Sequence, residues 1–352
     1  MFLLDSHCDT PSHILRLRDL AMDNKYSHVD FPKLRRGEVD GAFFALYIPA
    51  SMSASEGYIY ALKMLDGVRQ VLKDNPDKAR LATSRHEAYA NKADGRFSVF
   101  LGLENGVASG DNLERIDEFY DAGIRYMTLC HSKNNQICDS CAEGNGWNGL
   151  SRFGKDVVRR MNRLGMLVDV SHISDASFYD VLDVSERPVV ATHSCCRTLC
   201  NHPRNMTDEM IKLLAEAGGV VQINFYPLFL DCGFKTVLED SGIMEYGERI
   251  ESEFIADPSN PDKRAAWNRV QDKLTALKRP SYKRIADHID HVVEMVGIDH
   301  VGLGSDFDGI EVTPEGMEDI SKMPLLLEEL RCRGYSESDL CKIASDNFFR
   351  IL

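Results

Sequence analysis

The chain lacks any apolar run long enough to cross a membrane. Its 352 residues are 43% hydrophobic, yet no run approaches the roughly 18 residues of a transmembrane helix. The N-terminus also lacks the basic segment and long apolar stretch of a secretory signal peptide. We therefore expect a cytoplasmic protein that does not interact with a membrane.

An excess of positive charge is missing as well. The chain has 41 Lys and Arg residues against 55 Asp and Glu residues, a net charge of −14. Such a balance favours solubility and argues against nucleic acid as a partner. Internal repeats and Pro/Ser-rich linkers are also missing, so we expect residues 1–352 to form a single domain.

The ten cysteines lack the spacing of a structural zinc site. They cluster as Cys138-x-x-Cys141 and as Cys195-Cys196-x-x-x-Cys200, without the second well-spaced pair that such a site requires. With no secretory signal in the sequence, we expect reduced thiols.

What the chain does contain is a recurring pattern of short apolar runs followed by amphipathic helical segments. The runs are Phe2–Asp5, Gly41–Ile48, Phe97–Leu103, Gly123–Cys130, Met166–Ser171, Pro188–Thr192, Gly219–Phe225 and His300–Ser305. Most are almost continuously apolar, which is typical of strands buried on both faces of a parallel sheet. The clearest helical patterns are Asp156–Leu164, Thr207–Ala217 and Tyr282–Val296.

Eight alternations of strand and helix predict an α/β fold, a (β/α)₈ TIM-type barrel, with an open doubly wound sheet as the alternative. Two connections are longer than the minimal repeat. About 50 residues separate the second and third runs, and about 75 separate the seventh and eighth. The second gap contains the helical pattern Pro261–Leu277, so we expect a helical insertion between strands 7 and 8.

Polar residues that can bind metals follow six of the eight runs. They are His7 and Asp9, Glu104, His131, His172, His193 and Asp306. Taken singly, each is explained by a packed histidine or a helix-capping acid. In a barrel, however, the C-terminal ends of all strands meet at one mouth, so these residues would be neighbours. The other histidines lie in loop or helical patterns or at the start of a strand, and we expect them to be structural.

This ligand set predicts a metal-dependent hydrolase. Histidine and carboxylate ligands without cysteine suit zinc or a similar divalent ion. Three histidines and two carboxylates exceed what one catalytic zinc needs, so two ions bridged by a carboxylate and a hydroxide fit better. Such a site hydrolyses an amide, an ester or a phosphoester, and the spacing does not decide among them.

The motifs HCD, LEN, TLCHS, DVSH, ATHS with HPRN, and GSDFDG occur in this order along the chain. Together they resemble the membrane (renal) dipeptidase family, the M19 peptidases of the amidohydrolase superfamily. The resemblance implies a barrel with two zinc ions. Animal relatives carry a signal peptide and a lipid-anchor signal, and this chain, which ends in NFFRIL, is similar instead to a bacterial-type member without them.

The resemblance also implies a role for each site residue. His7 and Asp9 would bind one ion, His172 and His193 the other, with Glu104 as the bridge. His131 would contact the scissile carbonyl oxygen, Arg204 of HPRN would clamp the substrate carboxylate, and Asp306 would move the proton. The chemistry is consistent, because a guanidinium binds a carboxylate with two parallel bonds and a carboxylate can shuttle a proton.

Two of these assignments have local alternatives. Asp308 lies two residues beyond Asp306 and competes for the role of proton shuttle, although Asp306 is nearer the strand end. Without the resemblance, Arg204 would be read as a surface residue paired with Asp208.

The expected function is a zinc-dependent dipeptidase acting on L-Xaa-L-Xaa and L-Xaa-D-Xaa dipeptides. Its partner would be a small dipeptide, and a homodimer is left open. The alternatives are another amidohydrolase-type reaction, such as deamination or lactone hydrolysis, and a barrel that binds metal or ligand without turnover.

Overall fold

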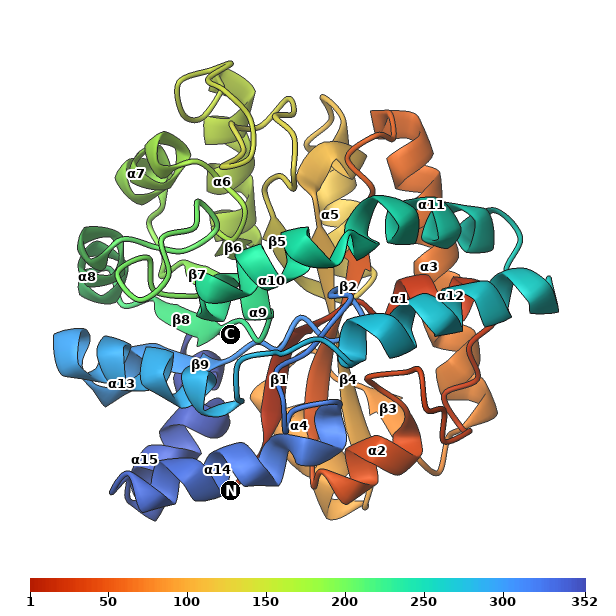
Figure 1. Cartoon of the computed structure of the whole chain (residues 1–352). Coiled ribbons are helices and arrows are strands. Elements are labelled where there is room, and N and C mark those ends of the chain that lie inside the picture. The colour runs from red at the N-terminus through yellow and green to blue at the C-terminus, as the bar shows by residue number, and fades with distance from the viewer.

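The computed structural model describes all residues 1–352 and contains one parallel sheet (Figure 1). Its strands are β1 Leu4–Cys8, β2 Gly41–Tyr47, β3 Ala79–Leu81, β4 Phe97–Glu104, β5 Ile124–Thr128, β6 Leu167–Asp169, β7 Val190–Ser194, β8 Val220–Ile223 and β9 Val301–Leu303. Eight of them follow one another in the order β1-β2-β4-β5-β6-β7-β8-β9. Backbone bonds from Asp9 N to Phe307 O (2.9 Å) and from Asp306 N to His7 O (3.0 Å) join the two ends of this path. The expected (β/α)₈ barrel is therefore confirmed.

Helices surround the strands on the outside of the barrel (Figure 1). They are α1 Thr10–Leu15, α2 Phe31–Arg36, α3 Ala54–Asp74, α4 Arg85–Ala93, α5 Glu114–Asp121, α6 Arg152–Leu164, α7 Asp175–Val184, α8 Asp208–Glu216, α9 Pro227–Leu230, α10 Gly233–Ser241, α11 Ile243–Ala256, α12 Pro261–Thr275, α13 Lys283–Val296, α14 Met323–Cys332, α15 Glu337–Cys341 and α16 Asn347–Ile351. The Thr207 side chain caps α8 by accepting a bond from Met210 N, which satisfies a free helix-end donor. None of these helices combines the length and apolarity needed to cross a membrane.

Each of the eight predicted apolar runs overlaps one strand of the barrel, although β1, β4 and β7 extend beyond the C-terminal ends of their runs. The strand that the sequence did not predict is β3, which has three residues and pairs only with β4 at the side of the main path. It lies in the long connection between the second and third runs. A strand this short carries too little periodicity to be recognised from sequence.

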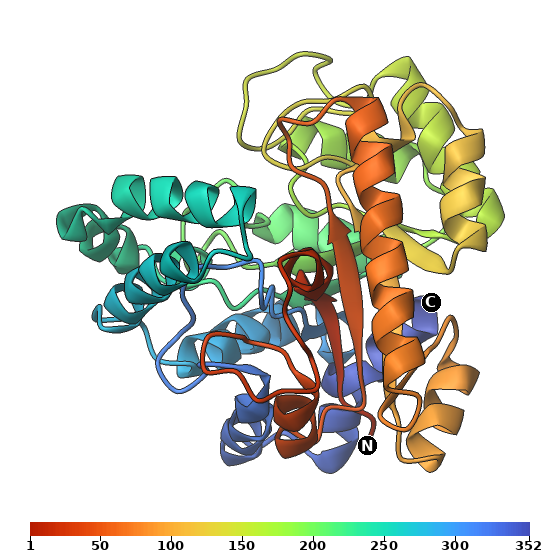
Figure 2. The same cartoon turned by 90° about the vertical axis from the view of Figure 1, so that its right-hand side faces the viewer.

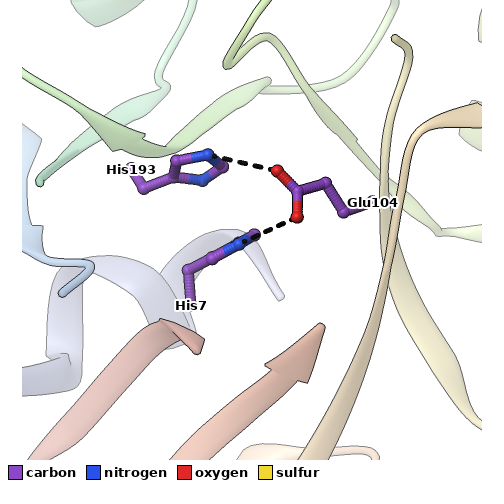
Figure 3. A group of neighbouring side chains, drawn as sticks. All are labelled: His7, Glu104 and His193. Atoms are coloured by element: carbon purple, nitrogen blue, oxygen red, sulfur yellow. Dashed lines mark ion pairs between the residues drawn. The ribbon is translucent and has the colours of Figure 1, made fainter. Parts of the chain in front are cut away.

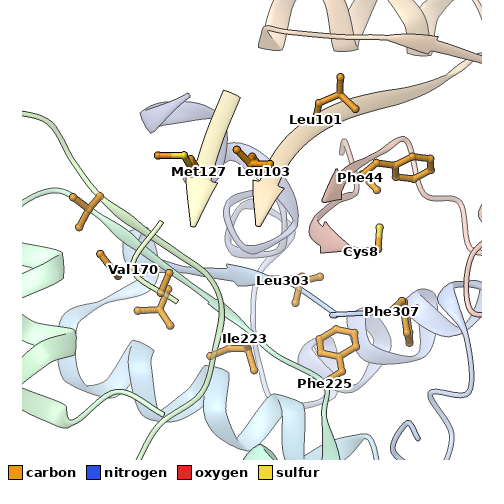
Figure 4. Close-up of a cluster of buried hydrophobic side chains, with 14 of the residues drawn as sticks. Cys8, Phe44, Leu101, Leu103, Met127, Val170, Ile223, Phe225, Leu303 and Phe307 are labelled. Carbon is orange, nitrogen blue, oxygen red and sulfur yellow. The ribbon is translucent and has the colours of Figure 1, made fainter. Parts of the chain in front are cut away.

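Two apolar layers hold the barrel together. The interior layer contains Leu4, Phe43 and Phe100, and it is closed at the bottom by Phe348 and its neighbours on α16. The larger outer layer packs the strands against the helices, and Figure 4 shows part of it. Cys8 belongs to this outer layer, as expected for a residue between two inward-facing ligands. All ten cysteines are free thiols.

The helical insertion lies between β8 and β9, where the sequence places it. The expected pattern Pro261–Leu277 corresponds to α12, which packs beside α11. These helices share a small apolar cluster of their own, with Phe254 and Trp267 among its members. In Figure 2 the teal helices project to one side of the strands.

Bulges in β1 and β7 aim two histidines into the barrel. The pairing register shifts between Asp5 and Cys8 in β1, and between Ala191 and Ser194 in β7. Leu4 and Val190 point into the interior layer, so strict alternation would turn His7 and His193 outward. A bulge adds one residue and re-aims the side chains that follow. The inward position of both histidines therefore depends on the bulges.

Gly102 in β4 makes room for Tyr126 in the barrel interior. A methyl group on Gly102 would overlap the ring and hydroxyl of Tyr126, which is fully buried. We expect Gly102→Ala to lower the free energy of unfolding by about 1–3 kcal/mol, because the overpacked ring must shift. Urea denaturation measures this loss. Gly144→Ala is the control, since open space surrounds that position, and equal stabilities of the two variants would contradict the packing argument.

Candidate active site at the barrel mouth

The carboxylate of Glu104, the last residue of β4, lies at the centre of the site. One of its oxygens, Oε2, lies 3.4 Å from His7 Nε2. The other, Oε1, lies 3.1 Å from His172 Nε2 and 3.5 Å from His193 Nε2. Figure 3 shows one carboxylate oxygen directed toward the ring of His7 and the other toward the ring of His193. Glu104 thus divides the histidines into two sets, one on each oxygen.

The remaining predicted residues lie around this centre. Asp9 Oδ2 is 3.8 Å from His7 Nε2, and His131 Nε2 is 3.9 Å from Glu104 Oε1. Asp306 forms a close group with His7 and Asp9, in which the ligand atoms lie within 4.8 Å of one another. The barrel therefore brings together residues that are spread over most of the sequence.

The cluster suits divalent cations. His7 Nε2 and Asp9 Oδ1 are buried without a hydrogen-bond partner, and a buried polar atom of this kind is costly unless something satisfies it. Three groups of histidines and carboxylates have the spacing of metal ligands. His131 belongs to one of these groups, together with Glu104 and His172. Nitrogen and oxygen donors without sulfur are the ligands of catalytic zinc sites.

The carboxylates of the cluster favour a positive charge on or next to the ring of His7. Burial acts to lower the pKa of His7, but the charges of Glu104 and Asp9 outweigh it and raise this pKa well above its ordinary value. For His172 and His193, burial and nearby positive groups lower the pKa well below the ordinary value. These two rings are neutral at pH 7, which leaves each with a nitrogen lone pair for a metal.

Asp306 has the environment of a group that exchanges a proton. It is half-buried and accepts a hydrogen bond from Asn224 Nδ2 at 2.9 Å. Burial and the negative charge of Asp9 raise its pKa to about 7, although His7 opposes them. A carboxyl group with a pKa near neutral can both accept and return a proton.

Asp308, the alternative proton shuttle, uses its carboxylate in hydrogen bonds to residues outside the ligand cluster. Its carboxylate accepts bonds from Arg18 NH1 at 2.6 Å and from Thr10 Oγ1 at 2.9 Å, and its backbone bonds to the rings of His13 and His28. Burial alone would raise its pKa, but Arg18 and the two histidines hold it far below the ordinary value. Asp308 therefore fastens the loop that carries Asp306, and His13 and His28 have the structural roles that we expect.

Arg204 is buried beside the ligand cluster and has no carboxylate partner. Its exposed fraction is 8%. It donates to His193 O at 2.9 Å and to Ser194 Oγ at 3.3 Å, while its Nε has no partner. Its guanidinium also lies over the ring of Phe229. It does not pair with Asp208, which binds His291 instead, so its charge is free for an anion.

His131 lies at the edge of the cluster with its ring against Tyr47. Burial, together with the positive charge of Arg204, lowers its pKa to about 3. The ring is neutral at pH 7 and can donate one N–H bond to an oxygen placed between it and Glu104.

Comparisons with known proteins agree with this geometry. Residues 1–352 match the family described as Membrane dipeptidase (Peptidase family M19). The chain belongs to this family. Dipeptidase aclJ of Aspergillus oryzae is 33% identical over 350 residues, which cover 97% of this chain and 73% of that protein. The expected dipeptidase family and its class of metal-dependent hydrolases are thereby confirmed.

Two solved structures share the fold of this M19 peptidase. The probable dipeptidase PvdM from Pseudomonas aeruginosa has a TM-score of 0.84 and 24% identity, with 100% of this chain and 94% of that chain covered. A metallo peptidase from Rhodobacter sphaeroides, liganded with a phosphinate mimic of L-Ala-D-Ala, has a TM-score of 0.81 and 24% identity, with 100% and 98% covered.

One cavity of this M19 peptidase lies away from its ligand cluster. A cavity of about 1110 Å³ is lined by residues at the N-terminal ends of the strands, including Leu3, Val39 and Phe97. All barrel strands run in the same direction, so this cavity and the cluster lie at opposite ends. The chemistry of the ligand set, rather than cavity size, locates the site.

Sequence reasoning missed several polar residues that support the ligands of this M19 peptidase. Tyr126 places its hydroxyl 2.8 Å from His7 Nδ1, and Asn224 holds Asp306. Asp169 and Thr192 lie just beneath His193. The available signal was a polar residue within an otherwise apolar run, as in MLVDVS and PVVAT.

We expect Asp308→Asn to destabilise the metal-free protein at pH 7 by about 3 kcal/mol, since it leaves the buried Arg18 without a counter-charge. The folded-state pKa of Asp308 is depressed below its ordinary value of 3.8. Its contribution is therefore fully present above that value and is lost as the pH falls through the folded-state pKa. Urea denaturation between pH 3 and pH 8 measures the difference.

Asp306→Asn should behave in the opposite way in the same experiment. The folded-state pKa of Asp306 is raised to about 7, so its ionised form costs stability above that pH. The variant should be more stable than the parent at pH 8 and should lose this advantage below pH 4. Similar effects of the two substitutions would contradict their different environments.

Proposed function

We propose that this chain is a zinc-dependent dipeptidase that hydrolyses L-Xaa-L-Xaa and L-Xaa-D-Xaa dipeptides with two zinc ions per chain. The observation that carries the proposal is the position of Arg204. This buried guanidinium has no carboxylate partner, and it donates directly to the backbone of His193 in the ligand cluster. A clamp for a free carboxylate beside a metal site selects a substrate whose reacting bond lies close to its C-terminus.

The two zinc ions would be held by the two sets of ligands that Glu104 separates. His7 and Asp9 would hold one ion, and His172 and His193 the other, with one oxygen of Glu104 for each. Support comes from the separate approach of His7 to Oε2 and of His172 and His193 to Oε1. When bound, the zinc ions would lower the pKa of a water nucleophile and polarise the scissile carbonyl.

The side chains around the metals then bind the substrate and move its proton. Arg204 binds the C-terminal carboxylate and so fixes the dipeptide length. The neutral ring of His131 donates a hydrogen bond to the carbonyl oxygen as negative charge develops on it. Asp306 accepts the proton of the attacking water and returns it to the leaving amine.

Tolerance of a D-residue at the C-terminal position is supported by the Rhodobacter sphaeroides metallo peptidase. That protein is liganded with a phosphinate mimic of L-Ala-D-Ala. A clamp that recognises only the carboxylate leaves the configuration of the adjacent carbon to the neighbouring side chains.

The first test is hydrolysis of L-Ala-L-Xaa and L-Ala-D-Xaa dipeptides by protein with measured metal content. We expect cleavage of both series, loss of activity after treatment with a strong chelator, and recovery on addition of two equivalents of zinc. Glu104→Gln should abolish binding of at least one equivalent. Activity that is indifferent to the chelator would overturn the proposal, and turnover of a cyclic amide or lactone alone would favour another amidohydrolase reaction.

Arg204→Ala tests the carboxylate clamp. We expect KM for dipeptides to rise by about 100-fold, because a charge-assisted pair in a buried site contributes roughly 1.5–3 kcal/mol. Arg204→Lys should recover only part of this loss, since an ammonium lacks the planar fork. Dipeptide amides, which have no carboxylate, should be equally poor substrates for the parent and the alanine variant. An unchanged KM for dipeptides would rule out the clamp.

A further inference from the structure

A buried carboxylate lies one layer beneath the ligand cluster. Asp169 is the last residue of β6 and is fully buried. Its Oδ1 accepts backbone bonds from Ser171 N at 3.0 Å and from Thr192 N at 2.9 Å. Its Oδ2 accepts bonds from the hydroxyls of Thr128 and Thr192, the latter at 2.7 Å. Four donors satisfy the four lone-pair positions of a carboxylate.

Thr192 connects this carboxylate to a proposed metal ligand. Its hydroxyl oxygen lies 2.7 Å from Asp169 Oδ2 and 2.9 Å from His193 Nδ1. A hydroxyl has one proton to donate. Since the carboxylate only accepts, the Thr192 proton points to Asp169, and the hydroxyl oxygen is left to accept a bond from His193. His193 Nδ1 therefore carries the proton, and the lone pair of the ring is on Nε2, which faces Glu104.

We propose that Asp169, acting through the hydroxyl of Thr192, is a positioning residue that fixes the ring orientation and tautomer of His193 for metal binding. The proposal rests on the proposed function, in which His193 holds a zinc ion. It extends that function to two residues that touch neither metal nor substrate. A ligand histidine is commonly oriented by a hydrogen bond from its second nitrogen, and here the acceptor is a hydroxyl whose direction a buried acid sets.

The surroundings argue against a purely structural role for the pair. Burying a carboxylate is costly, and an apolar residue at the same place in the strand would avoid that cost. His7, which approaches the other oxygen of Glu104, has a similar arrangement, with the Tyr126 hydroxyl 2.8 Å from its Nδ1. Each of these two inward-facing histidines thus has its Nδ1 held by a buried hydroxyl while its Nε2 faces the bridge.

Thr128 provides a matched control. Its hydroxyl donates to the same oxygen of Asp169 as Thr192 does, and it forms no hydrogen bond with His193. Thr128→Val and Thr192→Val therefore remove the same kind of bond from the same buried acid. They differ in whether the hydroxyl that lies 2.9 Å from His193 Nδ1, and 3.4 Å from His7 Nδ1, is lost.

The experiment measures zinc affinity of the folded, metal-free protein by competition with a chromogenic chelator. Thr192→Val should weaken the affinity of one zinc by 10–100-fold, and Thr192→Ser should restore it to within about threefold, because the hydroxyl returns. Asp169→Asn should weaken binding at least as much, since its amide donates to Thr192 and turns the hydroxyl proton toward His193 Nδ1. Thr128→Val should stay within about threefold of the parent.

Equal losses in Thr192→Val and Thr128→Val, or no rescue by Thr192→Ser, would overturn the positioning role. Unfolding of the metal-free variants, followed by circular dichroism, shows which of them are folded. If Thr192→Val does not fold, the comparison of Asp169→Asn with Thr128→Val decides in its place. Failure of the parent protein to bind zinc through Glu104 would instead contradict the proposed function, so the two failures are distinguishable.

Discussion

The site depends on one buried carboxylate, that of Glu104. It is 2% exposed, and two of its nearest polar neighbours, His7 and His193, are completely buried. A carboxylate in such a place is stable only if positive charge or hydrogen-bond donors surround it. Histidines lie near both of its oxygens, His7 at Oε2 and His131, His172 and His193 at Oε1. The raised pKa of His7 reflects the same demand for positive charge. Bound metal cations would meet that demand.

The barrel can present these ligands because its strand ends are irregular. Bulges in β1 and β7 turn His7 and His193 inward. His172 and Asp306 lie just beyond their strands with φ of 70° and 64°, in the left-handed region that non-glycine residues rarely adopt. Each of these conformations costs energy and persists because its surroundings hold it, as the Arg18–Asp308 pair holds the loop of Asp306. The lower barrel, filled by aromatic side chains, packs beneath the mouth.

Charge is distributed at the mouth according to the proposed chemistry. Burial lowers the pKa of His131, His172 and His193, and the positive charge of Arg204 lowers it further. It is a positive group without a carboxylate partner at the edge of a cluster rich in carboxylates. A substrate carboxylate would neutralise it, and the metals would balance Glu104 and Asp9. In the layer beneath, Asp169 orients the hydroxyl proton of Thr192 toward itself, which leaves the lone pair of His193 on the nitrogen that faces Glu104.

The sequence by itself determined the barrel, because eight apolar runs alternating with helical patterns are a local property of the chain. It also determined which seven polar residues meet at the mouth, because parallel strands place all their C-terminal ends together. Only the tertiary structure decided that histidines approach both oxygens of Glu104, that Arg18 binds the carboxylate of Asp308, and that Arg204 has no carboxylate partner. These are contacts between segments far apart in the chain, and no local pattern encodes them. The tertiary structure also decided the bulges that aim His7 and His193 inward, because pairing register is set only when the strands come together. The same holds for the hydrogen bonds of Asp169 and Thr192 beneath His193.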